Sequence, residues 1–345
     1  MQQSHKNFRK IKSLKSVLSI FSLVALFLLP SYQLAAQTKY SAELEGFEYP
    51  YPVKRFEFKS QQQNLQMAYM DVSGQTSNGK TVILMHGKNF CAATWQETIL
   101  QMVEAGYRVI APDQIGFCKS SKPQAYQFSF HQLAYNTNRL MNQLGIKQAA
   151  VMGHSMGGML ATRYALMYPQ QTSQLILVNP IGLEDWGKKG VPYQTIDQNY
   201  QAELSKTAAG IKQYQQHTYY VGKWEARFDR WVNMLAGMYA GQDKKLVAWN
   251  QAQTSDMVFT QPVVDELSHI KVPSLLLIGE LDNTAIGKSR ASAQLKTELG
   301  NYKVLGEQAA QAIPNAKLIE FSDLGHSPHI QSPERFHKAL FANLR

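Results

Sequence analysis

The stretch that decides the fold of this 345-residue sequence is Gly153-His154-Ser155-Met156-Gly157. Residues 148–152, before it, predict a short buried strand, and residues 161–167, after it, predict a helix. A serine flanked by glycines at a strand-to-helix corner is typical of a nucleophile elbow, in which a sharp turn holds the hydroxyl above the sheet edge. Side chains two positions before and after the serine would clash in such a turn, so we expect glycine to be required there.

This motif alone is not specific. With 22 glycines in the chain, the pattern Gly-x-Ser-x-Gly arises by chance on the order of once in ten such sequences. A Gly-rich loop that starts an ordinary helix is therefore the alternative interpretation. The strands, helices and polar residues around the motif decide between the two.

Strands and helices alternate along most of the chain. Residues 53–59 and 65–72 predict an opening antiparallel pair. Further strands are predicted at residues 81–85, 108–111, 149–152, 175–178, 274–278 and 316–321, and helices at 92–105, 128–144, 302–313 and 333–343. Such alternation predicts an α/β fold with a mostly parallel, doubly wound sheet that carries helices on both faces.

Residues 181–262 interrupt this alternation and contain four of the five tryptophans. We expect them to form a helical lid inserted into a core of residues 37–180 and 263–345. One apolar stripe in this lid has helical spacing. It consists of Trp224, Phe228, Trp231, Leu235 and Met238. These side chains pack within the lid and onto the core, or they line an apolar pocket beneath it, and both can hold for different residues.

Polar residues follow the last two predicted strands. Asp282 comes after residues 274–278, and His326 after residues 316–321. Because active groups in open parallel sheets lie at the carboxyl ends of strands, we expect both near Ser155. In this order they can form a triad in which the histidine takes the serine proton and the buried carboxylate orients the histidine. The alternatives for the acid are Glu280, Glu184 and Asp185, and the rival histidines are His329 and His337.

A tetrahedral oxyanion needs two preorganised N–H donors. The backbone N–H of Met156, directly after the serine, is the first expected donor. The second is expected from the loop after His86-Gly87, at the backbone of Lys88, with Asn89 as the alternative. We expect His86 itself to be structural and to turn this loop through a hydrogen bond.

Together these motifs resemble the α/β-hydrolase superfamily, in the branch with an H-G oxyanion loop and a G-H-S-M-G-G elbow. Residues 113–120, Asp-Gln-Ile-Gly-Phe-Cys-Lys-Ser, resemble the D-x-x-G-x-G-x-S loop of the family, and the resemblance covers residues 50–345. It implies a hydrolase fold, no metal or other cofactor, and a lid over the site. The sequence departs from the family at Cys118, where glycine is usual, and at Lys88-Asn89, where small or apolar residues are usual.

The nucleophile narrows the chemistry, because the fold alone does not settle the reaction. Family members that form alkyl-enzyme esters carry aspartate at the elbow, whereas Ser155 fits acyl transfer. We expect cleavage of a small or medium carboxylic ester through an acyl-enzyme. The alternatives are an amidase or aminopeptidase, a thioesterase, a C–C hydrolase, and a catalytically silent binding protein. An aminopeptidase would need acids for the substrate amine, for which the lid offers Glu225, Asp229 and Asp243.

The N-terminus predicts a secretory signal peptide over residues 1–36. Residues 1–15 contain five Lys or Arg and no acid, residues 17–29 are almost wholly apolar, and Leu34-Ala35-Ala36 supplies a cleavage site. The apolar run is shorter than the ~20 residues that a membrane span needs. We therefore expect a periplasmic or secreted protein without stable membrane insertion after cleavage, with an uncleaved anchor as the alternative.

The net charge and the cysteine content limit which partners the protein can have. The chain carries +10, and residues 1–36 contribute five bases, so the remainder carries +5. These charges are scattered, which disfavours nucleic acid and leaves a small-molecule substrate as the expected partner; nothing specifies an oligomeric state. The two cysteines, Cys91 and Cys118, lack metal-site spacing but follow neighbouring strands. They form a disulfide in an oxidising compartment or remain two half-buried thiols.

Overall fold

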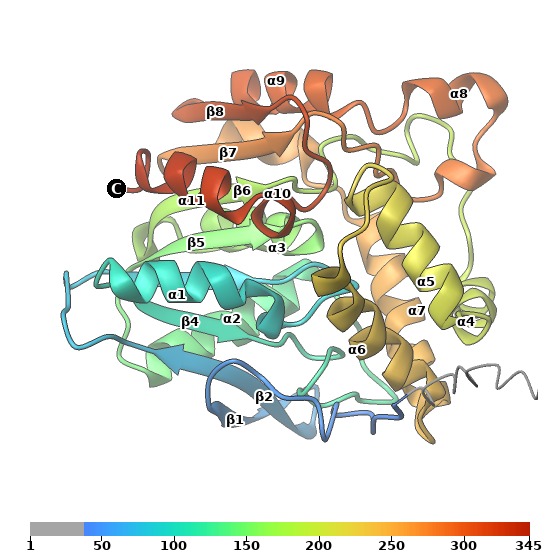
Figure 1. Ribbon diagram of the computed structural model, residues 1–345, viewed down its shortest axis with the longest axis horizontal. Helices are drawn as coiled ribbons and strands as arrows, with labels where there is room; N and C mark the ends of the chain where they lie inside the picture. Colours follow the sequence, from blue (N-terminus) through green and yellow to red (C-terminus); the bar gives the residue numbers. More distant parts are fainter. Residues whose placement is uncertain (1–37) are drawn as a thin grey trace, which may run out of the picture. The chain divides into compact units, whose positions relative to one another are not determined.

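The computed structural model describes residues 38–345, and the predicted signal peptide, residues 1–36, lies outside the described residues. An eight-stranded sheet in the order β1-β2-β4-β3-β5-β6-β7-β8 forms the centre (Figure 1). The strands are β1 (Val53–Ser60), β2 (Gln63–Val72), β3 (Thr81–Met85), β4 (Arg108–Pro112), β5 (Ala149–His154), β6 (Thr172–Val178), β7 (Ser274–Gly279) and β8 (Ala316–Phe321). β2 pairs antiparallel with β1 and β4, and the other pairs are parallel.

Helices cover both faces of the sheet, as the sequence predicts. The helices of the core are α1 (Gln96–Glu104), α2 (Phe130–Gln143), α3 (Met156–Met167), α8 (Ala293–Glu298), α9 (Tyr302–Ala312), α10 (Pro328–Gln331) and α11 (Pro333–Phe341). On β3, Val82 and Leu84 belong to the apolar cluster that α1 and α11 complete, whereas Ile83 and Met85 belong to the cluster that α2 and α3 complete. The central strands are continuous apolar runs because both of their faces are buried.

The predicted elements agree with the observed ones to within a few residues. The predicted helix over 92–105 begins as a 3₁₀ turn (Ala92–Trp95) and continues as α1. Two helices, α8 and α10, were not predicted, and they have six and four residues. Helices of one or two turns are too short to display an apolar period.

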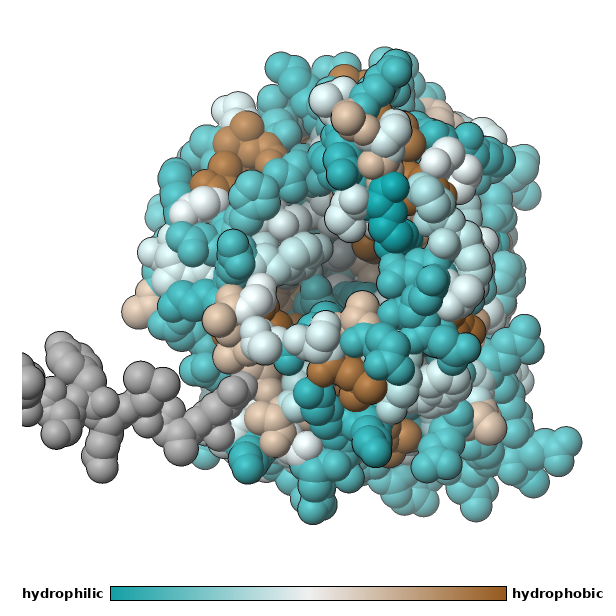
Figure 2. All heavy atoms as spheres, turned by 90° about the vertical axis from the view of Figure 1, so that its right-hand side faces the viewer, coloured by the Kyte–Doolittle hydropathy of each residue, from teal (hydrophilic) through white to brown (hydrophobic). Residues whose placement is uncertain are grey.

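Between β6 and β7 the chain forms helices at one end of the sheet, on the right in Figure 1. They are α4 (Ile196–Leu204), α5 (Ala208–Tyr214), a π-helical turn (Gln215–Tyr219), α6 (Asp229–Ala240) and α7 (Lys244–Thr260). We call residues 181–262 the lid. Lid residues such as Trp231 and Met257 share one apolar cluster with the core. Figure 2 views this side and shows a hollow near its middle, with apolar side chains on part of its rim.

Between residues 38 and 345, no helix is both long and apolar enough to cross a membrane.

Candidate active site

The turn between β5 and α3 is tight and requires its glycines. Ser155 sits in it with φ 57° and ψ −122°, a strained conformation that tight packing must hold. A Cβ at Gly153 would lie 1.9 Å from the carbonyl oxygen of Gly157, and one at Gly157 would lie 2.1 Å from that of Met85. Neither position can carry a side chain, as the steric requirements of the elbow predict.

The predicted acid and base meet after β7 and β8. Nδ1 of His326 donates a hydrogen bond to Oδ2 of Asp282 over 2.6 Å, and both residues are buried. Because Nδ1 carries the hydrogen, Nε2 of the neutral ring is an acceptor. In the described part of the chain, this Nε2 has no hydrogen-bond partner. The pair therefore presents the tautomer that can accept a proton from a serine.

The histidine loop is held directly against the elbow. Nε2 of His154, the residue before Ser155, donates to the carbonyl oxygen of His326 over 2.8 Å. Burial lowers the pKa of His154 well below its ordinary value. His154 is therefore a neutral donor that joins the elbow to the loop that carries His326.

The rival acids have other partners. Glu280 lies 3.6 Å from the amine of Lys303, and Glu184 accepts from the backbone N–H of Gly300 over 2.9 Å. Asp185 accepts from a backbone N–H three residues further along the chain. Among the acids considered, only Asp282 contacts the histidine.

The rival histidines lie on the α1 and α11 side of the sheet. Nε2 of His337 is 3.0 Å from the hydroxyl of Thr98, and the ring of His329 packs against Trp95 with 4.6 Å between centroids. Burial lowers the pKa of His337 to about 4 and that of His329 well below its ordinary value. Within residues 38–345 neither histidine contacts a carboxylate, so of the three candidate histidines His326 is the one paired with an acid.

Asn179 holds the acid and was not predicted from the sequence. It follows β6 with φ 36°, and its Nδ2 donates to Oδ2 of Asp282 over 3.0 Å. Its Oδ1 accepts from the backbone N–H of Gly279 over 2.8 Å, which ties the ends of β6 and β7 together. The other carboxylate oxygen of Asp282 accepts from the N–H of Thr284 over 2.8 Å. The only signal for Asn179 in the sequence is its place directly after a buried strand.

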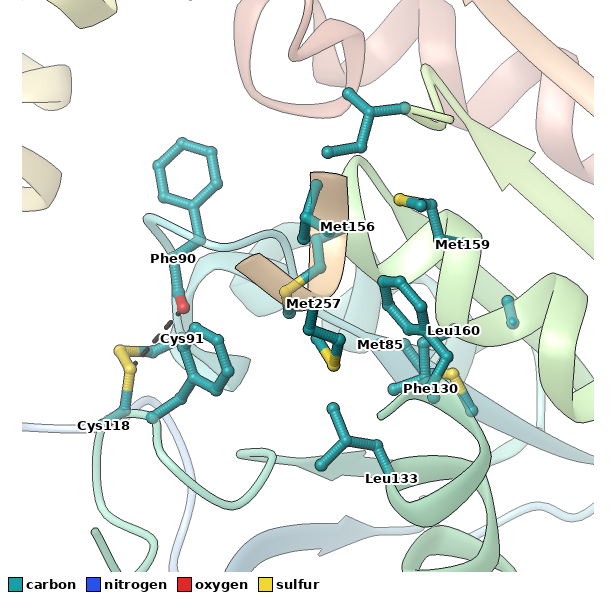
Figure 3. Close-up of a cluster of buried hydrophobic side chains, with 14 of the residues drawn as sticks. Met85, Phe90, Cys91, Cys118, Phe130, Leu133, Met156, Met159, Leu160 and Met257 are labelled. Atoms are coloured by element: carbon teal, nitrogen blue, oxygen red, sulfur yellow. Dashed lines mark hydrogen bonds between the residues drawn. A yellow bond between two sulfur atoms is a disulfide. The ribbon is translucent and has the colours of Figure 1, made fainter. Parts of the chain in front are cut away.

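The loop after β3 runs beside the nucleophile. A Cβ at Gly87 would lie 3.1 Å from the Cβ of Ser155, a tight contact, so glycine eases the close approach of this backbone. His86 shapes the loop as expected: its Nδ1 donates to the carbonyl of Gly87 over 2.9 Å, and its Nε2 accepts from the N–H of Gln114 over 3.0 Å. The side chain of Met156 lies in the buried cluster of Figure 3. Its backbone N–H is the first of α3 and has no acceptor within the helix.

The next two residues of this loop bind the lid through their side chains. Nζ of Lys88 contacts Oε1 of Glu203 over 3.0 Å and Oε1 of Gln251 over 3.2 Å. Nδ2 of Asn89 donates to the hydroxyl of Tyr219 over 2.8 Å. The Tyr219 ring in turn stacks on His326, with 4.9 Å between centroids. The side-chain amide of Asn89 is thus engaged by the lid, and the backbone N–H groups of Lys88 and Asn89 both stay candidates for the second oxyanion donor.

Cys91 and Cys118 form a disulfide beside this loop, with 5.8 Å between their Cα atoms (Figure 3). Cys118 adopts φ 45°, a left-handed conformation that favours glycine. Glycine would adopt this positive φ without strain, which explains why glycine suits position 118. In this protein the disulfide with Cys91 holds a cysteine in that conformation. In residues 38–345 the sole cluster of metal-type side chains is Cys91, Asp113 and Cys118. Its two thiols are used in the disulfide, so it offers a metal no thiolate.

Most of the apolar lid stripe is buried by packing, and the pocket that two of its residues line is far too small for an acyl or alcohol group. Phe228 and Trp231 are buried by packing. Leu235 and Met238 line a pocket of about 10 Å³ next to Lys88, which is room for about one water molecule. The pocket between these lid residues and the oxyanion loop therefore cannot hold an acyl group in this arrangement.

The strand order and the strand–turn–helix geometry around Ser155 are those of an α/β hydrolase. The family profile for the alpha/beta hydrolase fold matches residues 80–333, and the chain therefore belongs to this family of enzymes. A solved structure of a probable hydrolytic enzyme from Pseudomonas aeruginosa is 60% identical, with a TM-score of 0.89, over 90% of this chain and 99% of that one.

Two curated relatives are hydrolases of Comamonas testosteroni. A 2-hydroxy-6-oxo-6-phenylhexa-2,4-dienoate hydrolase is 26% identical over 79% of this chain and 90% of that protein. A 2-hydroxy-6-oxononadienedioate/2-hydroxy-6-oxononatrienedioate hydrolase is 40% identical, but over 30% of this chain and 38% of its own length. The second match therefore spans well under half of that relative.

Proposed function

We propose that this enzyme hydrolyses a small or medium carboxylic ester through a covalent acyl-enzyme on Ser155. The hydrogen bond from His326 to Asp282 carries this proposal, because it leaves an imidazole base on a loop that His154 ties to the nucleophile elbow. No other pair of an acid and a histidine among the candidates has this arrangement in the described residues.

In the proposed reaction, Oγ of Ser155 attacks the ester carbonyl while Nε2 of His326 takes its proton. Asp282 stabilises the resulting imidazolium, and the N–H groups of Lys88 and Met156 bind the oxyanion. Collapse expels the alkoxide, which receives the proton from His326 and leaves as the alcohol. Water then attacks the acyl-enzyme, with His326 again as base. The carboxylic acid departs, and the serine regains its proton.

C–C bond hydrolysis is the second candidate, because the Comamonas testosteroni relative that aligns over 90% of its length is named for a dienoate substrate of that kind. The structure lends no support to an aminopeptidase. Its three candidate acids are engaged elsewhere: Glu225 pairs with Arg227, Asp229 pairs with Lys212, and the carboxylate of Asp243 accepts from a backbone N–H.

The test is turnover of p-nitrophenyl esters of increasing acyl length, compared with matched anilides, thioesters and a 2-hydroxy-6-oxo-dienoate. We expect the short and medium esters to give the highest kcat/KM and Ser155→Ala to abolish it. Higher kcat/KM on the dienoate would replace ester hydrolysis by C–C hydrolysis. A folded protein that turns over none of these and reacts with no fluorophosphonate would be a binding protein.

We further propose that residues 1–36 direct export and are removed. The basic, apolar and small-residue segments support this, and the Cys91–Cys118 disulfide suits an oxidising compartment. N-terminal sequencing of the native protein tests it, with a start near Gln37 expected. A start at Met1 in the membrane fraction would instead make residues 17–29 an anchor.

A further inference from the structure

The lid and the oxyanion loop are joined by a buried ion pair. The amine of Lys88 and the carboxylate of Glu203 lie 3.0 Å apart, with side chains only 14% and 7% exposed. Lys88 comes from the loop that passes Ser155, whereas Glu203 comes from α4 in the lid. The residue that the proposed function assigns as an oxyanion donor thus also anchors its side chain in the lid.

The partners of Lys88 are themselves fixed by further contacts. Oε2 of Glu203 lies 2.6 Å from the amine of Lys206 and accepts from the hydroxyl of Tyr239 of α6. Gln251 of α7 donates through its Nε2 to the carbonyl of Gly116 over 3.2 Å. Within the described residues no polar atom of Lys88, Glu203 or Gln251 is left buried without a partner. A fully partnered network of this kind favours one fixed arrangement over a vacant ligand site.

We propose that Glu203 is a positioning residue for catalysis: through the Lys88 ammonium it holds the oxyanion loop with its backbone N–H directed at the reacting carbonyl. This inference rests on the proposed acyl-enzyme function. The same contacts of Lys88 with Glu203 of α4 and Gln251 of α7 therefore fix the lid and the oxyanion loop to each other.

Because the Lys88–Glu203 ion pair depends on the charge of Lys88, it is sensitive to alkaline pH. Burial lowers the pKa of Lys88 to about 8, with Glu203 opposing this effect and Lys206 adding to it. Burial would raise the pKa of Glu203, but Lys206 and Lys88 outweigh this and lower it to about 2. The other ionisable groups near this pair are Tyr239 of α6 and, in the core, Lys122 on the same small pocket. As the pH rises through about 8, Lys88 loses its proton, the ion pair is lost, and kcat should fall.

The test compares Glu203→Gln, Lys88→Met and Lys88→Arg in ester hydrolysis by the full-length mature enzyme. Removing one oxyanion donor costs about 100- to 1000-fold in kcat, so misplacing it should cost Glu203→Gln and Lys88→Met about tenfold or more. KM should change little, because the oxyanion contact strengthens in the transition state. Inhibition by an aryl boronic acid, which forms a tetrahedral adduct, should weaken in parallel with kcat.

Lys88→Arg supplies the decisive pH profile, because a guanidinium keeps its charge throughout the assay range. This variant should retain activity and extend the plateau of kcat beyond pH 8. The matched control is Asp229→Asn, which removes a lid carboxylate that pairs with Lys212 away from the oxyanion loop. Its kcat should equal that of the parent.

The outcomes separate this inference from the function on which it rests. If the parent enzyme hydrolyses no ester, the proposed function is wrong. If the parent is active and Glu203→Gln keeps its kcat and boronate affinity, the positioning role is overturned. If Glu203→Gln does not fold, the pH profile of Lys88→Arg decides: an unchanged decline near pH 8 contradicts the proposal, and its loss supports it.

Discussion

His154 donates a hydrogen bond from its Nε2 to the carbonyl oxygen of His326, over 2.8 Å, in a fully buried setting. The residue before Ser155 therefore holds the loop that carries His326. The pKa of His154, lowered by burial, keeps the ring neutral and leaves one proton for this bond. The residue before the serine, which the Gly-x-Ser-x-Gly motif leaves unspecified, thus has a structural role in this protein.

Replacing His154 by phenylalanine removes this donor and keeps a ring in place. A buried carbonyl left without its partner costs about 1–3 kcal/mol, and we expect kcat to fall about tenfold as the histidine loop loosens. Ester kinetics and a thermal melt measure the two effects. His337→Phe is the control, because His337 is buried but bonded to Thr98; it should lower stability and spare kcat. Wild-type kcat in His154→Phe would show that the bond does not position the base.

Asn179→Ala should also lower kcat, because Asp282 loses a donor and the ends of β6 and β7 lose their tie. A hydrogen bond to a charged group contributes about 1.5–3 kcal/mol, so a loss of about tenfold is expected. The control is Asn138→Ala, which removes a buried amide on α2 that donates to the hydroxyl of Tyr164. If both variants lose stability but neither loses kcat, Asn179 is merely structural.

The disulfide should stabilise the fold even though Cys118 adopts a left-handed conformation. Cys91 and Cys118 are 27 positions apart, for which the chain-entropy relation gives about 3.5 kcal/mol. We expect Cys91→Ser/Cys118→Ser to lose stability of this size in denaturant unfolding. Cys91→Ser/Cys118→Gly should recover about 1 kcal/mol, because glycine relieves the positive φ.

A thiol count on unreduced, denatured protein checks the bond itself. No free thiol is expected, and two free thiols would contradict the disulfide. Equal stability of the serine and glycine variants would show that the conformation of Cys118 carries no strain.

Stability should fall in mild acid because buried histidines are neutral in the folded protein. Burial lowers the pKa of His337 from 6.5 to about 4. Below pH 6.5 the unfolded chain therefore binds a proton that the folded protein refuses until about pH 4. The free energy of unfolding then falls with decreasing pH across this window, by at most about 1.4 kcal/mol per pH unit per histidine.

Denaturant titrations at pH 7 and pH 5 test this dependence. His337→Gln should show a smaller loss between the two pH values than the parent, whereas His269→Gln, at an exposed position, should match the parent. An unchanged loss in His337→Gln would assign the acid sensitivity to other groups.

The sequence predicted the sheet and the pairing of Asp282 with His326 because both follow from local rules. Apolar runs mark the strands, and the ends of parallel strands gather polar groups at one edge. Ser155, Asp282 and His326 each lie just beyond such a run, which is why the sequence predicts them at the same edge of the sheet. The need for glycine at positions 153 and 157 was equally predictable, because it is steric and arises within one turn.

The contacts that tune the site could not be predicted, since they join segments with no common spacing. The ion pair of Lys88 with Glu203 spans 115 positions, and nothing in the lid sequence marks Glu203 above its other acids. Tyr219 reaches His326 from a π-helical turn, a rare form that often lies at functional sites but has no sequence period. Asn179 depends on a positive φ that only the packed strand ends enforce.

Substitution of the triad should affect ester hydrolysis as one unit. Ser155→Ala and His326→Ala should each lower kcat by about 10⁴ or more, and Asp282→Asn by a similar or smaller factor. Glu280→Gln is the matched control, because Glu280 also follows β7 but faces Lys303. If Asp282→Asn were active and Glu280→Gln inactive, the acid of the triad would be Glu280.

The most direct measurement is mass spectrometry of the folded protein after reaction with a fluorophosphonate, followed by peptide mapping. A Ser-His-Asp site predicts one adduct, on the peptide that contains Ser155. It also predicts none in Ser155→Ala and strongly slowed labelling in His326→Ala, with equal melting temperatures. Absence of any adduct on the folded wild-type protein, or an adduct that persists in Ser155→Ala, would contradict the account.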